Sequence, residues 1–327
     1  MTRITRRAAL IGFLLMGVST GAAHAEGTGR IFVSNEKGNA LTVLSAKDYS
    51  PVGEVKTGRQ PRGMVFSPDH KRLYVACGGA DRIDIVDVAT LKVVDRIGKI
   101  SDPETFALDA AGQHLYASNE EASELTVIDI ATKQIMRHFK VGLEPEGVLL
   151  NHDDTKVYVA SEGSNLVHVF DLASGARKDI AVGTRPRRFA MTPDGKELWV
   201  STELAGQVDV IDTATNAVTG KIDFLPPGMR KEDVSPVALV IDGEGKTAYV
   251  TLGRANHVGI VDVASRKVTG YVLVGQRPWG ITFSKDQKRL FVANGGSDDV
   301  SIIDTAARKV VKSVPVGHYP YGVAIDE

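Results

Sequence analysis

Short apolar runs separated by polar turns return along the chain in a fixed order. The segment from Gly58 to Val94 shows one unit: Pro-x-Gly with an apolar run, then Ser-Pro-Asp, then Leu-Tyr-Val-Ala, then an alternating run ending in Ile-Val-Asp. Apolar or alternating runs of about four to eight residues bounded by Pro, Gly and Asp indicate β-strands joined by tight turns. Each unit therefore predicts four strands, the last of them basic and polar, as an exposed sheet edge requires.

The spacing of these units is regular along the chain. The proline that opens each unit falls at Pro61, Pro103, Pro145, Pro186, Pro236, Pro278 and Pro320. The steps between these marker prolines are 42, 42, 41, 50, 42 and 42 residues, and each of the first six is followed 26 residues later by an aspartate. A period of about 40 residues with several strands per unit is typical of a β-propeller.

The two ends of the repeat region are complementary fragments. The N-terminal part opens in the middle of a unit with Ile31–Ser34, and the C-terminal part ends with a lone first strand, Pro320–Ile325. We predict an all-β fold over residues 26–327: a single seven-bladed propeller of four-stranded blades, closed by the C-terminal strand joining the N-terminal blade. The one long step places eight extra residues around Phe224–Asp233, which form either a tolerated surface insertion or a functional loop.

The first 25 residues have the features of a cleavable signal peptide. Arg3, Arg6 and Arg7 precede an apolar run at 8–18, and Ala23-His24-Ala25 is a small-x-small cleavage site. The run is too short for a membrane span, which needs about 20 residues. We therefore expect a periplasmic protein without a membrane span after cleavage, exported by the general or the twin-arginine route.

Charge and cysteine content exclude several classes. The chain carries a formal charge of −1, which becomes −4 when the three leader arginines are removed. A mildly acidic protein is a poor nucleic-acid binder, because such binding rests on Lys and Arg at phosphates. Cys77 is the single cysteine, so no internal disulfide can form. We expect a monomer.

The strand motifs resemble a known family. Tyr74-Val75-Ala76, Tyr158-Val159-Ala160 and Tyr249-Val250-Thr251, with Pro-x-Gly before them and Ile/Val-Asp-x-Ala after them, resemble the repeats of the YVTN-repeat family of seven-bladed propellers. Within that family the chain looks most like exported propellers associated with PQQ-dependent catabolism. The resemblance implies as partners a quinoprotein dehydrogenase, a c-type cytochrome or a transporter component. It offers no catalytic motif to carry over.

In a propeller, the loops before the first strand and after the second strand gather at one mouth of the channel, the default ligand site. The predicted ligand-binding residues at this mouth are Arg62, Glu104, Glu146, Arg187, Trp279 and Tyr321. A secondary rim is predicted from Glu36, Glu120, Glu162, Glu203, Arg185, Arg277 and His318. Arginines and aromatic rings together suit a planar polyacid such as PQQ, or a protein surface. The alternative is that these charges pair with one another on a solvated rim.

Signals for chemistry are absent. No G-x-S-x-G motif, no serine with a placed histidine and acid, and no CxxCH haem motif occurs, and no histidine pair has metal-ligand spacing. We therefore predict no catalytic residue, no metal and no cofactor. Calcium held by Glu36, Glu120 or Glu162 is a weaker alternative.

Three functions remain open. The first is a non-catalytic exported propeller that binds a small molecule or a protein partner at the channel mouth, accessory to PQQ-dependent alcohol oxidation. The second is a lactonase-like hydrolase at the same mouth, with His318 as acid or base. The third is a purely structural scaffold for a dehydrogenase–cytochrome complex.

Overall fold

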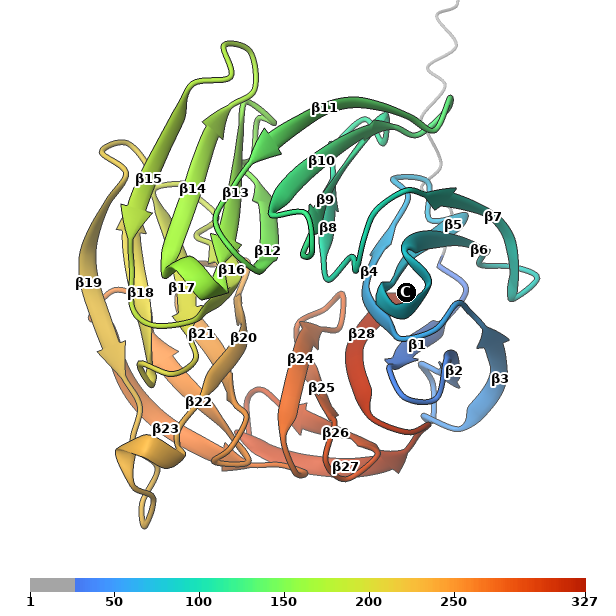
Figure 1. Ribbon diagram of the computed structural model, residues 1–327. Coiled ribbons are helices and arrows are strands. Elements are labelled where there is room, and N and C mark those ends of the chain that lie inside the picture. The colour runs from blue at the N-terminus through green and yellow to red at the C-terminus, as the bar shows by residue number, and fades with distance from the viewer. Residues whose placement is uncertain (1–26) are drawn as a thin grey trace, which may run out of the picture.

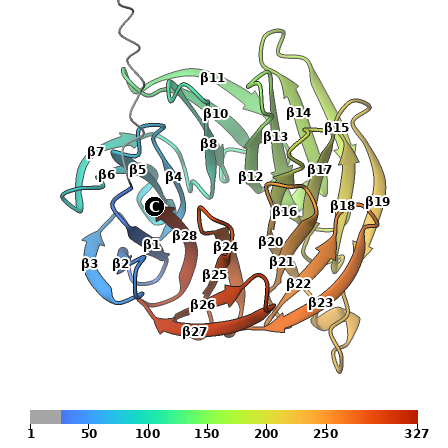
Figure 2. The same cartoon turned by 180° about the vertical axis from the view of Figure 1, so that it is seen from behind.

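The protein is a ring of β-sheets. The computed structural model describes residues 27–327, so the predicted signal peptide lies outside the described part of the chain. Within that part, 28 strands form seven antiparallel four-stranded sheets that stand around a central channel like the blades of a propeller (Figure 1, Figure 2). This architecture confirms the predicted fold class. No helix of residues 27–327 is long and apolar enough to cross a membrane.

Within each blade the four strands follow one another from the channel to the outside of the ring (Figure 1). The innermost strands are β4 (Pro61–Phe66), β8 (Phe106–Leu108), β12 (Pro145–Leu150), β16 (Pro186–Met191), β20 (Pro236–Ile241), β24 (Pro278–Phe283) and β28 (Pro320–Asp326). The second strands are β1 (Arg30–Asn35), β5 (Arg72–Cys77), β9 (His114–Asn119), β13 (Lys156–Ser161), β17 (Glu197–Thr202), β21 (Thr247–Leu252) and β25 (Arg289–Asn294). The third strands are β2 (Ala40–Ser45), β6 (Arg82–Asp87), β10 (Glu124–Asp129), β14 (Leu166–Asp171), β18 (Gln207–Asp212), β22 (His257–Asp262) and β26 (Asp299–Asp304). The outer strands are β3 (Pro51–Lys56), β7 (Lys92–Gly98), β11 (Gln134–Lys140), β15 (Arg177–Ala181), β19 (Ala217–Asp223), β23 (Lys267–Leu273) and β27 (Lys309–Pro315). Three short 3₁₀ turns, η1 (Gly78–Ala80), η2 (Glu162–Ser164) and η3 (Lys231–Asp233), lie in the connecting loops.

The inner strand of one blade is shorter than expected. β8 begins at Phe106 and not at Pro103, where the repeat predicts it. The Thr105 hydroxyl donates to the Glu146 carbonyl of the next blade, and the Thr105 N–H donates to the Ser118 hydroxyl at 3.2 Å. The Ser118 N–H also donates to the Thr105 carbonyl at 3.1 Å, so Thr105 stays joined to β9 although the assigned strand begins one residue later.

The C-terminal strand closes the ring. β28 pairs antiparallel with β1, with Arg30 opposite Asp326 and Ser34 opposite Gly322, as the complementary fragments predicted. Asp326 Oδ2 accepts hydrogen bonds from the Thr28 N–H at 2.8 Å and from the Thr28 hydroxyl at 2.6 Å. Both ends of the described chain are thus tied into one blade, which removes the open sheet edge.

The apolar cores lie between neighbouring blades. One such core joins Phe32 and Leu41 of the first blade to Leu73, Val75 and Val86 of the second. A buried aromatic ring recurs at the third position of each second strand, at Phe32, Tyr74, Tyr116, Tyr158, Trp199, Tyr249 and Phe291. Burying a large apolar side chain contributes roughly 1.5–3 kcal/mol, so this single repeat position stabilises every blade contact.

The eight extra residues form an anchored element. Phe224 is 1% exposed and packs in the core between two blades, where Gly259 makes room for its ring. A Cβ on Gly259 would lie 2.8 Å from Phe224 Cδ1. The Leu225 N–H donates to the Tyr271 hydroxyl at 2.8 Å. The insertion therefore starts from a fixed base, while Leu225 itself is 56% exposed.

Candidate functional site

The same turn conformation precedes the inner strand in six of the seven blades. The residue before the marker proline has a positive φ at Gln60, Asp102, Glu144, Arg185, Arg277 and Tyr319. This conformation is unfavourable for residues with a side chain, so other contacts must hold it. In five blades an Asn or Asp of the preceding blade accepts the N–H of that residue, the pairs being Asn39–Gln60, Asp81–Asp102, Asn165–Arg185, Asn256–Arg277 and Asp298–Tyr319.

Hydroxyl groups on the second strands fix the next residue along. The Ser34 hydroxyl donates to the Arg62 carbonyl at 2.8 Å, and the Thr251 hydroxyl donates to the Trp279 carbonyl at 2.8 Å. Ser201 does the same for Val237. Each bond joins one blade to the residue after the marker proline of the next blade. The backbone of the predicted site is therefore held from blade to blade.

Arg62 is the centre of one charge cluster at the mouth. Its side chain is 11% exposed, with Nε 2.9 Å from Glu36 Oε1 and Nη1 2.7 Å from Asp102 Oδ1. Nη1 also contacts the Glu104 carboxylate, and Glu120 lies 4.0 Å away. Burial opposes the charged guanidinium, but the carboxylates around it outweigh this effect and raise the pKa of Arg62. Nε and Nη1 of this guanidinium are thus both paired with carboxylates.

Arg187 is the centre of a second cluster and is more deeply buried. Its Nη2 bonds Glu146, and its Nη1 lies 2.9 Å from Glu203 Oε2. Nη1 also lies 2.6 Å from Glu162 Oε1, but that oxygen accepts no hydrogen bond, so we treat this contact as an ion pair only. All four side chains are at most 6% exposed. Arg185 adds a contact of 2.6 Å to Glu162 from the half-exposed rim.

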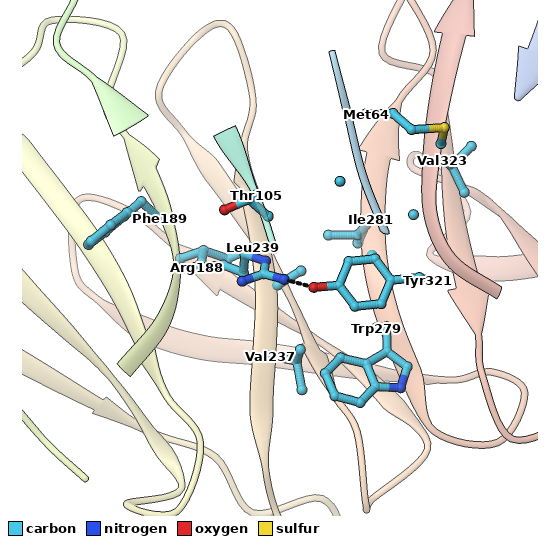
Figure 3. Close-up of a pocket in the computed structure, with 14 residues that line it drawn as sticks. Met64, Thr105, Arg188, Phe189, Val237, Leu239, Trp279, Ile281, Tyr321 and Val323 are labelled. Carbon is cyan, nitrogen blue, oxygen red and sulfur yellow. Dashed lines mark hydrogen bonds between the residues drawn. The ribbon is translucent and has the colours of Figure 1, made fainter. Parts of the chain in front are cut away.

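Arg188 and Tyr321 join the two clusters across the channel. Arg188 donates to Glu146 and to the Tyr321 hydroxyl, as the dashed line in Figure 3 shows for Tyr321. The Tyr321 hydroxyl in turn donates to Glu104 Oε2 at 2.6 Å. Burial raises the pKa of Tyr321, which keeps this hydroxyl protonated and able to donate. The two clusters and this link are called the mouth network below.

The mouth network has more acids than bases. Its four arginines are Arg62, Arg185, Arg187 and Arg188, and its seven acids are Glu36, Asp102, Glu104, Glu120, Glu146, Glu162 and Glu203. Burial raises the pKa of Glu120 to about 7, helped by the nearby charges of Glu104 and Asp102. Burial also raises the pKa of Glu162, against the opposing effect of Arg187 and Arg185. At neutral pH some of these carboxyl groups are therefore protonated and uncharged, which reduces the excess of negative charge.

The remaining arc of the mouth is aromatic and apolar. The rings of Trp279 and Tyr321 stack with centroids 5.7 Å apart and planes at 19°. The guanidinium carbons of Arg187 and Arg277 lie 4.8 Å and 5.3 Å from the Trp279 ring, within cation–π range. Val237 occupies the equivalent position in the blade that precedes that of Trp279.

A cavity of about 210 Å³ lies in the channel beside the Arg188–Tyr321 link. Its walls come from the inner strands and are mostly apolar (Figure 3). Arg188 brings a charged group to this wall, and Thr105 and Tyr321 bring hydroxyls. A mostly apolar hollow with a few convergent polar groups is the usual form of a small-molecule site.

The structure brings the six predicted ligand residues together, but largely in contact with one another. Most of the predicted rim joins them, since Glu36, Glu120, Glu162, Glu203 and Arg185 belong to the mouth network and Arg277 packs on Trp279. His318 does not: it is exposed and pairs with Asp298 at 3.0 Å. Sequence reasoning left out Arg188 as a ligand residue. The signal was available, because Gly63, Gly147, Gly280 and Gly322 occupy this position in other units.

One constellation was missed. Ser161 Oγ lies 3.1 Å from His168 Nε2, and Asp179 Oδ1 lies 2.7 Å from His168 Nδ1, so a serine does have a placed histidine and acid. It is not arranged for catalysis, because Ser161 and His168 are fully buried and the Gly142 N–H donates to His168 Nε2 at 2.8 Å. Sequence distance hid it, since the partners lie on three strands.

The same position has a structural role in other blades. Asp84 accepts the Gly58 N–H at 2.7 Å, and Asp209 accepts the Gly183 N–H at 2.9 Å. His168 therefore caps a loop glycine as these aspartates do. Among residues 27–327, no group of three or more His, Cys, Asp or Glu is placed to hold a metal ion.

Comparison with known proteins identifies relatives of the fold. The profile of the family described as YNCE-like β-propellers matches residues 30–284. No curated protein matches the chain at a significant level.

Several solved structures have the same fold at low identity. Hydrazine synthase from Kuenenia stuttgartiensis aligns with a TM-score of 0.72 and 24% identity over 80% of this chain and 88% of that chain. A functionally unknown protein from Desulfotomaculum acetoxidans aligns with a TM-score of 0.77 and 15% identity over 92% of this chain and 99% of that chain. A candidate 6-phosphogluconolactonase from Bacteroides fragilis aligns with a TM-score of 0.76 and 16% identity over 94% of this chain and 100% of that chain. At these identities the likeness concerns the fold alone.

Proposed function

The chain belongs to the YNCE-like β-propeller family, and from this premise we propose that it is a non-catalytic exported binding protein whose ligand enters the channel at the mouth network. The observation that carries the proposal is the cavity beside the Arg188–Tyr321 link, with the stacked rings of Trp279 and Tyr321 in its wall. Polar groups from several blades converge there, which is how propellers and other concave folds bind small molecules. The resemblance to propellers of PQQ-dependent catabolism supports an accessory role in quinoprotein alcohol oxidation.

PQQ itself is a poor ligand for this mouth. Arg62, Arg187 and Arg188 are all paired with carboxylates, and the mouth network contains more acids than arginines. A polyacid would have to displace these carboxylates and would meet further negative charge. The proposed ligand is therefore another small molecule of the oxidation system, such as an alcohol or its oxidised product.

A thermal-shift panel tests the proposal. The protein without its first 25 residues is scanned with alcohols, the matching aldehydes and acids, PQQ and calcium. A ligand at 100 times its Kd adds about 2.7 kcal/mol to the free energy of unfolding. We expect a saturable rise in Tm with a member of the alcohol and aldehyde groups and none with PQQ. A flat response to every compound would rule out the small-molecule function.

The protein partner is proposed on the same face. Leu204 lies in the loop between β17 and β18, and Leu225 lies in the loop between β19 and β20. Both loops are at the mouth, and the two side chains are 51% and 56% exposed. A quinoprotein dehydrogenase, a c-type cytochrome or a transporter component is the partner that the resemblance implies. The double variant L204S/L225S should weaken co-purification of that partner from a periplasmic extract, whereas V52S on the outer edge strand β3 should not. Equal recovery of the partner with the wild type, L204S/L225S and V52S would exclude this face as the docking surface.

Hydrolysis of a lactone is the second candidate. It is favoured by Glu120, a half-buried carboxyl at the mouth whose pKa is raised to about 7, as a general base requires. Sugar-lactone hydrolysis by the wild-type protein and by E120Q tests it. Turnover that is lost in E120Q would support the hydrolase, and no turnover by the wild type would exclude it.

A further inference from the structure

The cavity in the channel has a size that limits what it can hold. Its volume is about 210 Å³. An apolar cavity of about 150 Å³ is known to bind benzene. The cavity therefore has room for one six-membered ring with a small substituent. Three fused rings, as in PQQ, exceed this volume, so such a ligand would have to extend out of the cavity into the open channel.

The walls favour an aromatic ring. Met64, Leu239, Ile281 and Val323 surround the hollow from four inner strands, and Trp279 and Tyr321 close one side (Figure 3). Contact with these groups removes the apolar surface of the ligand from water, which favours binding. Aromatic rings also gain from offset or edge contacts with Trp and Tyr.

Charge in the wall favours a neutral ligand. Arg188 already contacts the Glu146 carboxylate, and its Nη2 lies 3.7 Å from Glu104 Oε2. An anion would add a third carboxylate at this guanidinium, and a cation would face the guanidinium directly. An uncharged ligand avoids both costs.

Arg188 also supplies the polar contact that would orient the ligand. A guanidinium has five N–H donors. Arg188 uses one at Nη1 for Glu146 and one at Nη2 for the Tyr321 hydroxyl. A carbonyl or hydroxyl oxygen in the cavity can accept a further N–H or take the place of the Tyr321 hydroxyl. A hydrogen bond from a charged donor is stronger than one between neutral groups, so it can fix one orientation of the ligand.

We propose that the cavity binds a single-ring, uncharged aromatic alcohol or its carbonyl product, with the ring against Trp279 and Tyr321 and the oxygen on Arg188. This rests on the proposed binding function and narrows its ligand class. It also separates two parts of the channel: the mouth network keeps acids away, and the cavity beside it selects by ring size and by one oxygen.

A charge- and size-matched series of compounds tests the inference. Acetophenone and benzyl alcohol have one ring and an oxygen, toluene lacks the oxygen, benzoate and benzylammonium add a charge, and 2-acetonaphthone adds a ring. Saturation-transfer NMR detects weak binding to the protein without residues 1–25. We expect saturable binding of acetophenone and benzyl alcohol, at least tenfold weaker binding of toluene, benzoate and benzylammonium, and none of 2-acetonaphthone.

Variants locate the binding. V323F fills the cavity and should abolish acetophenone binding, whereas V94F makes the same change on the exposed outer strand β7 and should not. If V323F does not fold, A238L fills the same hollow from β20. Y321F frees an Arg188 N–H and should bind acetophenone at least as tightly as the wild type.

The outcomes distinguish the inference from the function on which it rests. Acetophenone binding that survives both V323F and A238L, or a preference for benzoate, overturns the inference. If a compound of the thermal-shift panel raises Tm but acetophenone neither binds nor competes with it, the protein is a binding protein and the cavity is not its aromatic site. If nothing in either series binds, both proposals fall.

Discussion

Arg188 on β16 donates a hydrogen bond to the Tyr321 hydroxyl on β28, and this bond crosses the channel between two blades that are not neighbours in the ring. β16 packs against β12 and β20, and β28 packs against β24 and β4. Through Glu104 and Glu146 the bond also connects the Arg62 cluster to the Arg187 cluster. Changes at one side of the mouth are therefore expected to be felt at the other.

Removing the Tyr321 hydroxyl tests this link. Y321F leaves the ring stacked on Trp279 but removes the donor to Glu104 and the acceptor for Arg188. Leaving buried polar groups unsatisfied costs about 1–3 kcal/mol. We expect urea unfolding to show a loss of that size. Y74F deletes the hydroxyl of another buried ring outside the mouth network and should cost clearly less; equal losses for the two variants would refute the link.

The Arg187 cluster is expected to be the most sensitive charge in the protein. R187M leaves Glu146, Glu162 and Glu203 without their central cation in a buried site. Removing one partner of a buried ion pair costs about 3–5 kcal/mol, and the loss should shrink at pH 5, where the freed carboxyls can protonate. Urea unfolding at pH 5 and pH 8 measures both. The control R230M removes an exposed arginine paired with Asp233 and should leave the unfolding free energy unchanged. A mild effect of R187M at pH 8 would mean that water reaches the cluster.

The contribution of Glu120 to stability should fall as the pH rises from about 4.5 to 7. The pKa of Glu120 is raised in the folded protein from 4.5 to about 7, because of burial and neighbouring acids. In this window the Glu120 carboxyl binds more protons in the folded state than in the unfolded state, so its contribution to the free energy of unfolding decreases with pH. E120Q should flatten this slope and be more stable than the wild type at pH 8, as measured by urea unfolding at several pH values.

The matched control for this pH effect is an exposed glutamate. Lys246 lowers the pKa of Glu244 through a surface hydrogen bond, so E244Q should keep the wild-type slope. A slope that is identical in the wild type and E120Q would show that Glu120 does not titrate in the predicted window.

Ring closure is expected to govern the stability of the whole propeller. Deleting residues 320–327 removes β28 and opens the first blade, which exposes an unpaired edge and the cores on both sides. We expect a large drop in Tm in differential scanning calorimetry, and an unchanged Tm would contradict the closure. D326N is the finer variant: it weakens the acceptor for the Thr28 N–H and hydroxyl and should cost about 1–3 kcal/mol. D48N, on an exposed turn, serves as its control.

Most of the fold was readable from spacing, and the site was readable only as a set of positions. The marker prolines gave the blade count, and the incomplete units at the two ends gave the closure by β28. The positions after the prolines gave Arg62, Glu104, Glu146, Arg187, Trp279 and Tyr321 as residues of one mouth. Pairing of these charges with one another was one of two alternatives in the sequence. Which partner each side chain reaches, and that the pairs are buried, was not predictable, because a repeat fixes where a residue starts and not where its side chain ends.

The sequence by itself determined the repeat, because hydrophobic alternation and turn residues act over a few neighbours in the chain. Only the tertiary structure decided the rest. It paired the arginines with carboxylates up to 84 positions away, placed Arg188 against Tyr321 across 133 positions, and formed the Ser161–His168–Asp179 contacts. These contacts depend on the curvature of the ring and on burial, which shift pKa values and select partners only once the seven blades have closed.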